Sequence, residues 1–317
     1  MRTRFAPSPT GPLHLGHVAA MIFVWGLADR EQATIDVRIE DHDRQRCRPE
    51  YTDRLIADLE WLGFLPARGG NWSRQSSHFD RYESALSALR DRGLIYACEC
   101  SRKILGTTRD GLEPCYAGTC RDRRLPESPT TLLRIRLPDD RIRFFDDRHG
   151  VQVQQPANQS GDFVIRDRHG HWTYQFAVTV DDLTDGIDWI IRGDDLLPST
   201  GRQLLLRRLL GNDATPRLFH HPLILDANGR KLSKSEAAPP LEDLRQAGYS
   251  AAQVIGLAAL RVGLVSEGIA VEAAEVGEWV GRGLTPPRSP GKVTEDACRD
   301  GGESPIRCRD DRPLLED

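Results

Sequence analysis

Apolar and polar positions alternate along the first hundred residues as expected for strands and helices taken in turn. Residues 3–8 (TRFAPS) predict a short strand and a turn, and residues 34–41 (TIDVRIED) predict a strand that ends in acidic residues. Helical spacing of apolar positions covers residues 17–30, 49–64 and 78–93. This order predicts an α/β fold, a parallel sheet with crossover helices.

The pattern breaks between residues 98 and 161, where cysteines, prolines and short β-like stretches replace long helices. It resumes over residues 163–210, continues as a strand and loop over 218–235, and predicts helix over 241–264. We therefore expect a catalytic domain in two halves, an insertion, a short helical region and a disordered tail. Their bounds are 1–97 and 162–236 for the domain, 98–161 for the insertion, 237–281 for the helical region and 282–317 for the tail.

Composition excludes several classes of protein. The 317 residues carry a net charge of −4, so any nucleic-acid-binding basic surface must be local. No apolar run is long enough to span a bilayer, and the N-terminus lacks the apolar region of a signal peptide. We expect a cytoplasmic monomer with no membrane contact. Four of the seven cysteines, Cys98, Cys100, Cys115 and Cys120, are clustered, which in a reducing compartment indicates a metal site.

Two motifs indicate nucleotide chemistry. In residues 4–17 (RFAPSPTGPLHLGH), the start of the next helix can bind an anion, Gly16 lets a flat ring approach the backbone, and His14 and His17 can face one spot. In residues 229–235 (GRKLSKS), Lys231 and Lys234 can offset charge on phosphates. A capped turn and a solvated basic loop are the structural alternatives for each motif alone.

Together these motifs resemble the class I aminoacyl-tRNA synthetases, specifically their glutamyl branch. HLGH is similar to the His-x-Gly-His signature, and KLSKS to the Lys-Met-Ser-Lys-Ser loop with Leu for Met. The likeness extends to VRIEDHD (37–43) and to residues 174–200. It implies a Rossmann-type parallel sheet, split by an insertion that contacts tRNA, with ATP as substrate and Mg²⁺ as its counterion. The resemblance implies that His14, His17 and Lys234 are catalytic. It also implies that ATP is bound by His14, Gly16, His17, Lys231 and Lys234.

The resemblance also implies a glutamate pocket that elementary chemistry makes reasonable. Arginine offers a bidentate fork to a carboxylate, which suits Arg4 and Arg192, and an acid such as Glu40 suits the substrate's ammonium. Tyr174 occupies the position of a tyrosine that hydrogen-bonds the bound glutamate. Surface ion pairs are the structural alternative. The remaining residues implied in this pocket are Phe5, Ala6, Pro7 and Ser8.

The clustered cysteines fit one structural zinc ion, which prefers four ligands in a tetrahedron. Chemistry alone selects Cys115 as the fourth ligand beside Cys98, Cys100 and Cys120, because a thiolate binds zinc better than a phenolate. The layout resembles the Cys-x-Cys…Tyr-x3-Cys site of the glutamyl-Q tRNA(Asp) synthetases, which selects Tyr116 instead. The fourth ligand stays open at this point.

Too few apolar residues follow Ser235 to build the helical anticodon-reading domain of a glutamyl-tRNA synthetase. This again resembles the glutamyl-Q branch, whose members activate L-glutamate with ATP without tRNA and attach it to queuosine at the wobble position of tRNA(Asp). The alternatives are a truncated aminoacylating synthetase and a non-catalytic paralogue. The second is disfavoured, because His14, His17 and Lys234 are all present.

Overall fold

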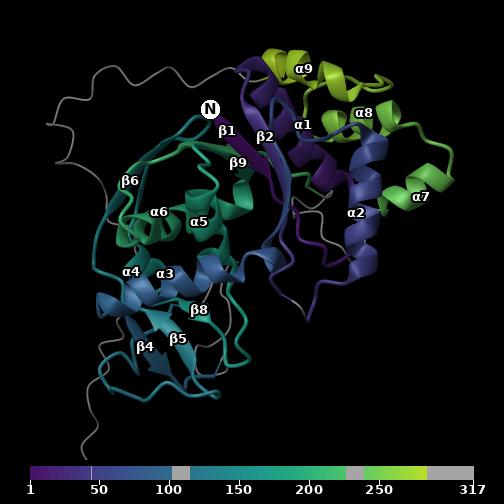
Figure 1. The fold of residues 1–317 in the computed structure, drawn as a ribbon. Coiled ribbons are helices and arrows are strands. Elements are labelled where there is room, and N and C mark those ends of the chain that lie inside the picture. Colours follow the sequence, from purple (N-terminus) through teal and green to yellow (C-terminus); the bar gives the residue numbers. More distant parts are fainter. Residues whose placement is uncertain (44, 102–114, 226–238, 284–317) are drawn as a thin grey trace, which may run out of the picture.

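The computed structural model describes residues 1–43, 45–101, 115–225 and 239–283, and it has the expected α/β architecture (Figure 1). The KLSKS loop, with Lys231 and Lys234, and most of the tail expected to be disordered lie outside the described residues. No helix among the described residues combines the length and the apolar character needed to cross a bilayer.

Two sets of parallel strands lie in the part of the molecule that contains His14 and His17. Strands β1 (Arg2–Phe5), β2 (Thr34–Ile39) and β3 (Trp72–Arg74) form one parallel sheet in that order. Strands β9 (Trp189–Gly193) and β10 (Arg217–His221) form a parallel pair. The Asp188 backbone N–H donates to the Arg2 carbonyl at 3.2 Å, which places β9 beside β1 (Figure 1). The expected strand at 34–41 is therefore present and lies between two neighbours.

The helices on this half share one core. Helix α1 (Leu15–Arg30) is buried on almost every side, between the sheet and the C-terminal helices α8 (Ala251–Arg261) and α9 (Val276–Gly283) (Figure 1). Gly26 permits the close approach of α9, because a Cβ there would lie 2.7 Å from Val280 Cγ2. Helix α2 (Pro49–Leu62) starts with proline and ends at Gly63, whose φ of 83° stops the helix.

The expected single helix over 241–264 is two helices. Helix α7 (Leu241–Gln246) ends before Gly248, which has a φ of 87°, and Ser250 then caps α8 by accepting from the Gln253 backbone N–H at 3.2 Å. The apolar spacing runs through this corner because both helices face the same core. Periodicity alone therefore did not reveal the break.

A second core takes residues from several antiparallel strands, and its elements lie to the left of and below those of the first in Figure 1. Strands β4 (Ile95–Cys98), β5 (Leu132–Ile135) and β8 (Val164–Arg166) form one antiparallel sheet, and β6 (Ile142–Asp146) pairs with β7 (Gly150–Gln154). The β4–β5–β8 sheet takes strands from both flanks of the 98–161 segment. The helices of this half are α3 (Phe79–Asp91), α4 (Pro156–Gln159), α5 (Tyr174–Thr184) and α6 (Thr200–Leu209).

Candidate active site

The two signature histidines form the N-terminal cap of α1. The Nδ1 atom of His14 accepts from the Gly16 backbone N–H at 3.1 Å, and the Nδ1 atom of His17 accepts from the His14 backbone N–H at 3.1 Å. The ring centroids are 4.1 Å apart. A Cβ on Gly16 would lie 2.9 Å from the His14 ring, so glycine is needed for this packing. The cap therefore holds both rings at the positive end of a long helix.

The turn after β1 joins this cap to the end of β2. Among residues 5–8, Phe5 packs on Trp25 with ring centroids 5.6 Å apart, and the Pro7 carbonyl accepts from the Glu40 backbone N–H at 2.9 Å. The Glu40 carboxylate is 2% exposed, and burial raises its pKa to about 7, although Arg38 and Arg4 oppose that shift. Two predicted glutamate-pocket segments therefore meet through the backbone.

Arg4 and Glu40 belong to a buried network that sequence reasoning missed. Arg4 donates from Nε to Asp182 Oδ1 at 2.9 Å, and Arg38 Nη2 donates to the same oxygen at 2.7 Å. Arg38 Nη2 also lies 3.3 Å from Glu40 Oε1. A signal was available: Arg38 lies between Val37 and Ile39 in a predicted strand, and paired acids follow in residues 174–185. A buried arginine requires acidic partners.

Arg192 is the other predicted carboxylate-binding arginine, and β9 carries it into the same region. Its three guanidinium nitrogens donate to Gln203 Oε1 at 2.5 Å, Thr200 Oγ1 at 2.8 Å and His220 Nε2 at 3.0 Å. Burial, together with the charge of Glu40, raises the pKa of Tyr174 to about 12, while Arg192 and Arg4 oppose the shift. The four predicted residues thus share one electrostatic environment.

A small cavity of about 10 Å³, which has room for one water molecule, is lined in part by Arg192. Asp182, Gln203 and Arg207 also line it. Arg207 is 6% exposed, and its Nε and Nη1 atoms have no hydrogen-bond partner among the described residues. Burial lowers its pKa, with Asp182 opposing. Sequence reasoning missed Arg207 because Arg208 beside it is also an arginine. Only the packing shows that Arg207 is buried and Arg208 is half-buried.

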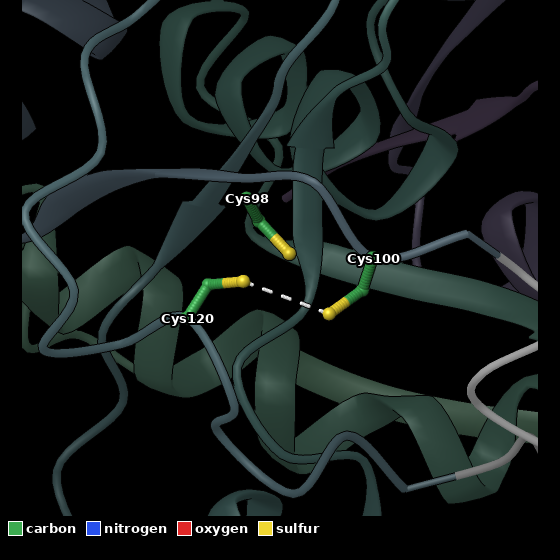
Figure 2. Close-up of side chains that lie close together, drawn as sticks. All are labelled: Cys98, Cys100 and Cys120. Carbon is green, nitrogen blue, oxygen red and sulfur yellow. Dashed lines mark hydrogen bonds between the residues drawn. The ribbon is translucent and has the colours of Figure 1, made fainter.

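The cysteine cluster is a second site, remote in sequence from the first. Figure 2 shows the side chains of Cys98, Cys100 and Cys120 pointing toward one another, and their sulfurs all lie within 4.8 Å. The Cys100 and Cys120 sulfurs are 3.6 Å apart. Three thiolates held tetrahedrally at a Zn–S distance of about 2.3 Å have sulfurs about 3.8 Å apart. The cluster therefore has the size that a zinc ion requires.

The fourth position separates Tyr116 from Cys115. The Tyr116 hydroxyl oxygen lies 3.5 Å from the Cys98 sulfur and accepts from the Cys120 backbone N–H at 2.8 Å. The Cys115 sulfur instead lies 4.0 Å from the Ala157 carbonyl oxygen. The packing brings the tyrosine, and not the adjacent cysteine, to the three sulfurs.

The surroundings favour the thiolate at Cys120 but not at Cys100, whose pKa burial and the neighbouring thiols raise to about 11. Arg134 donates from Nε to the Cys98 sulfur at 3.3 Å and stacks over the Tyr116 ring at 3.7 Å from its centroid. Burial would raise the pKa of the Cys120 thiol, but hydrogen bonds from the Glu99 backbone N–H and the neighbouring thiols lower it to about 7. At Cys120 these donors stabilise the thiolate form that binds metals.

Comparison with known proteins identifies the family. Residues 1–271 match the family described as tRNA synthetases class I (E and Q), catalytic domain. The chain is 43% identical over 268 residues to a glutamyl-Q tRNA(Asp) synthetase of Burkholderia cenocepacia, covering 81% of this chain and 89% of that protein. It is 39% identical over 249 residues to a glutamate–tRNA ligase of Frankia casuarinae, covering 78% of this chain and 53% of that protein.

A solved structure gives the same result. A glutamate tRNA ligase from Elizabethkingia meningosepticum, in complex with its amino acid, matches with a TM-score of 0.62 and 30% identity, over 78% of this chain and 53% of that chain. The chain thus spans about half the length of the glutamate–tRNA ligases it matches, and most of the length of the glutamyl-Q relative. The chain belongs to the class I tRNA synthetases (E and Q), within their catalytic domain.

Proposed function

We propose that this protein activates L-glutamate with ATP, without tRNA, and transfers the glutamate to queuosine at the wobble position of tRNA(Asp). The observation that carries the proposal is that buried Arg4, Glu40 and Arg192 share one electrostatic environment with half-buried Tyr174, although the four lie in separate segments of the chain. The match to the glutamyl-Q relative over 89% of that protein's length supports the choice of acceptor.

The pocket chemistry suits an amino acid with an anionic side chain. Three hydrogen bonds fix the orientation of the Arg192 guanidinium, and Asp182 fixes that of Arg4. Both guanidinium groups are therefore pre-positioned for the side-chain carboxylate of the substrate glutamate. Glu40 offers the negative charge that the substrate's ammonium group requires, and binding that cation favours ionised Glu40. The Tyr174 hydroxyl donates a hydrogen bond to the bound glutamate.

The first step forms glutamyl-AMP. The α-carboxylate of glutamate attacks the α-phosphorus of ATP, a phosphorus–oxygen bond forms, and pyrophosphate leaves. Because a carboxylate is already ionised, the step needs no base; it needs positive charge around the phosphates. His14 and His17 at the start of α1, with Gly16 beside them, would supply donors, and Lys231 and Lys234 of the signature loop would supply cations. Mg²⁺ bound with ATP would offset the remaining phosphate charge.

The second step moves the glutamyl group to RNA. A hydroxyl of the queuosine cyclopentenediol attacks the acyl carbonyl, an ester forms, AMP leaves, and the hydroxyl proton is lost to the departing phosphate or to water. A zinc ion on Cys98, Cys100, Tyr116 and Cys120 would supply a structural crosslink. The proximity of β1 and β9 supports the interpretation that the two parallel strand sets form one Rossmann-type sheet, interrupted in sequence by this zinc-binding segment.

Two assays test the proposal. Glutamate-dependent ATP–pyrophosphate exchange is expected without any tRNA, and labelled glutamate is expected to move only to tRNA from queuosine-replete cells. Label on the 3′ end of tRNA(Glu) would instead establish an aminoacylating synthetase. No exchange from folded, zinc-loaded protein would refute the catalytic function of the His14–His17 motif.

A further inference from the structure

An open groove lies between α2 and β3, at the end of β2. Its volume is about 490 Å³, within the range of small-ligand pockets. Ile39 and Ile56 form its apolar floor, and Trp72, Arg74 and His78 line its edge. This groove is distinct from the glutamate cluster, and the proposed first step uses none of these residues.

Trp72 is the unusual residue of this groove. The other five tryptophans, at positions 25, 61, 172, 189 and 279, each pack against an aromatic ring or under an arginine within the described residues. Trp72 has no such partner in the described part of the chain, and it is 40% exposed. An indole that leaves its face open in a groove offers a stacking surface for a flat ligand.

The polar groups beside Trp72 suit a nucleotide. Within the described ranges, the side chains of Arg74 and His78 make no hydrogen bond or ion pair, so both can donate to a phosphate. Glu60, the carboxylate among the lining residues, can accept from a ribose hydroxyl or a base amine. Bases stack on tryptophan while arginine contacts the backbone in many single-stranded RNA complexes.

The position of the groove favours the RNA acceptor over ATP. Ile39 lines the groove and Glu40 is the next residue of the chain, so the groove and the proposed glutamate pocket both lie at the end of β2. Gln75, next to Arg74, donates to Asp181 at 2.8 Å, so the segment that lines the groove is hydrogen-bonded to the buried network around Arg38. The His14–His17 cap follows β1, and β2 separates β1 from β3. A nucleotide on Trp72 would therefore lie at the end of β2, on the side away from β1 and the His14–His17 motif that follows it.

We infer that the Trp72 groove receives an unpaired nucleotide of the acceptor RNA, next to the one that takes glutamate. The base stacks on the Trp72 indole, and Arg74 and His78 contact the phosphate. The identity of the RNA rests on the proposed function. A wobble nucleotide lies in a single-stranded loop, so its neighbours are unpaired and can stack on the indole.

The test separates the two steps of the reaction. Trp72→Ala is expected to lower kcat/KM for queuosine-containing tRNA by about 5- to 150-fold, the range that corresponds to about 1–3 kcal/mol for one base stacked on an aromatic side chain. Trp72→Phe is expected to recover most of this loss. The KM values for glutamate and ATP in tRNA-free exchange should not change. Tyr249→Ala removes an aromatic side chain of similar exposure, 41%, elsewhere on the surface and is the matched control.

A second variant tests the phosphate contact. Arg74→Gln is expected to reduce the salt dependence of tRNA binding, measured by fluorescence anisotropy, by about one unit of slope. Transfer by Trp72→Ala at the wild-type rate would overturn the inference. A raised KM for ATP in exchange would also overturn it and assign the groove to ATP. Absence of exchange in the wild type would refute the proposed function, and the anisotropy measurement would still test the groove.

Discussion

Asp182 pairs with Arg4, a residue of the proposed glutamate pocket, and with Arg38 beside it, so the effect of its charge can be tested directly. Its carboxylate, 4% exposed, accepts from Arg4 at 2.9 Å and from Arg38 at 2.7 Å. Burial alone would raise the pKa of Asp182, but the two guanidinium groups lower it. Asp182→Asn keeps the shape of the side chain and removes only the charge.

The structure determines the size of the effect. Removing one partner of a buried ion pair costs about 3–5 kcal/mol, because the other charge stays buried and uncompensated. Arg38 retains Glu40, Asp181 and Asp185 within 4.0 Å, whereas Arg4 loses the one acid that it contacts among the described residues. One uncompensated charge places the expected loss near the lower limit, about 3 kcal/mol.

Urea unfolding followed by circular dichroism measures this loss. The matched control is Asp29→Asn, which breaks an exposed pair with Arg68, whose side chains are 52% and 31% exposed. Exposed pairs contribute about 0–1 kcal/mol, so the control should lose no more than that. We also expect Asp182→Asn to raise the KM for glutamate, since Arg4 loses its anchor. A loss equal to that of the control would refute the reasoning about buried charge.

Three further predictions concern other buried groups. Arg207→Met should leave the free energy of unfolding unchanged or raise it by about 1–3 kcal/mol, because it removes a buried cation with unpaired donors, whereas half-buried Arg208→Met should change it little; urea unfolding compares the two. Cys100→Ser should lower the zinc content, measured by mass spectrometry, from one per chain toward zero and lower the Tm, and zinc retained in full would contradict the proposed ligand set; Cys47→Ser, outside the cluster, should change neither. The pKa of Glu40, raised by burial to about 7, leaves the carboxyl neutral below that pH, so the KM for glutamate in exchange should rise toward tenfold per pH unit as pH falls below 7, and a flat profile would contradict this assignment. The sign for stability is opposite: unfolded Glu40 titrates near 4.5, so its contribution to stability decreases as pH rises from 4.5 to 7.

Local patterns predicted the elements well, because each depends on neighbouring residues. The strand at 34–39 and the helices beginning near 15, 49 and 79 follow from β-branched runs, helical spacing and a proline start. The division between α7 and α8 was missed, since Gly248 and Ser250 change the backbone direction without interrupting the apolar pattern. The fourth position of the cysteine cluster was also undecidable from order alone, because Cys115 and Tyr116 are adjacent.

The sequence by itself determined the order of strands and helices, the His-x-Gly-His motif at the start of α1 and the presence of a cysteine cluster. Spacing along the chain sets these features, since backbone hydrogen bonds and turn geometry are local. Only the tertiary structure decided which charges are buried together: Arg207 looks in sequence like any surface arginine, and nothing in the sequence says which acids Arg38 contacts. It also decided that Trp72 alone among the tryptophans has an open face in the described structure. Burial and pairing depend on segments that are distant in sequence and meet only when the cores pack.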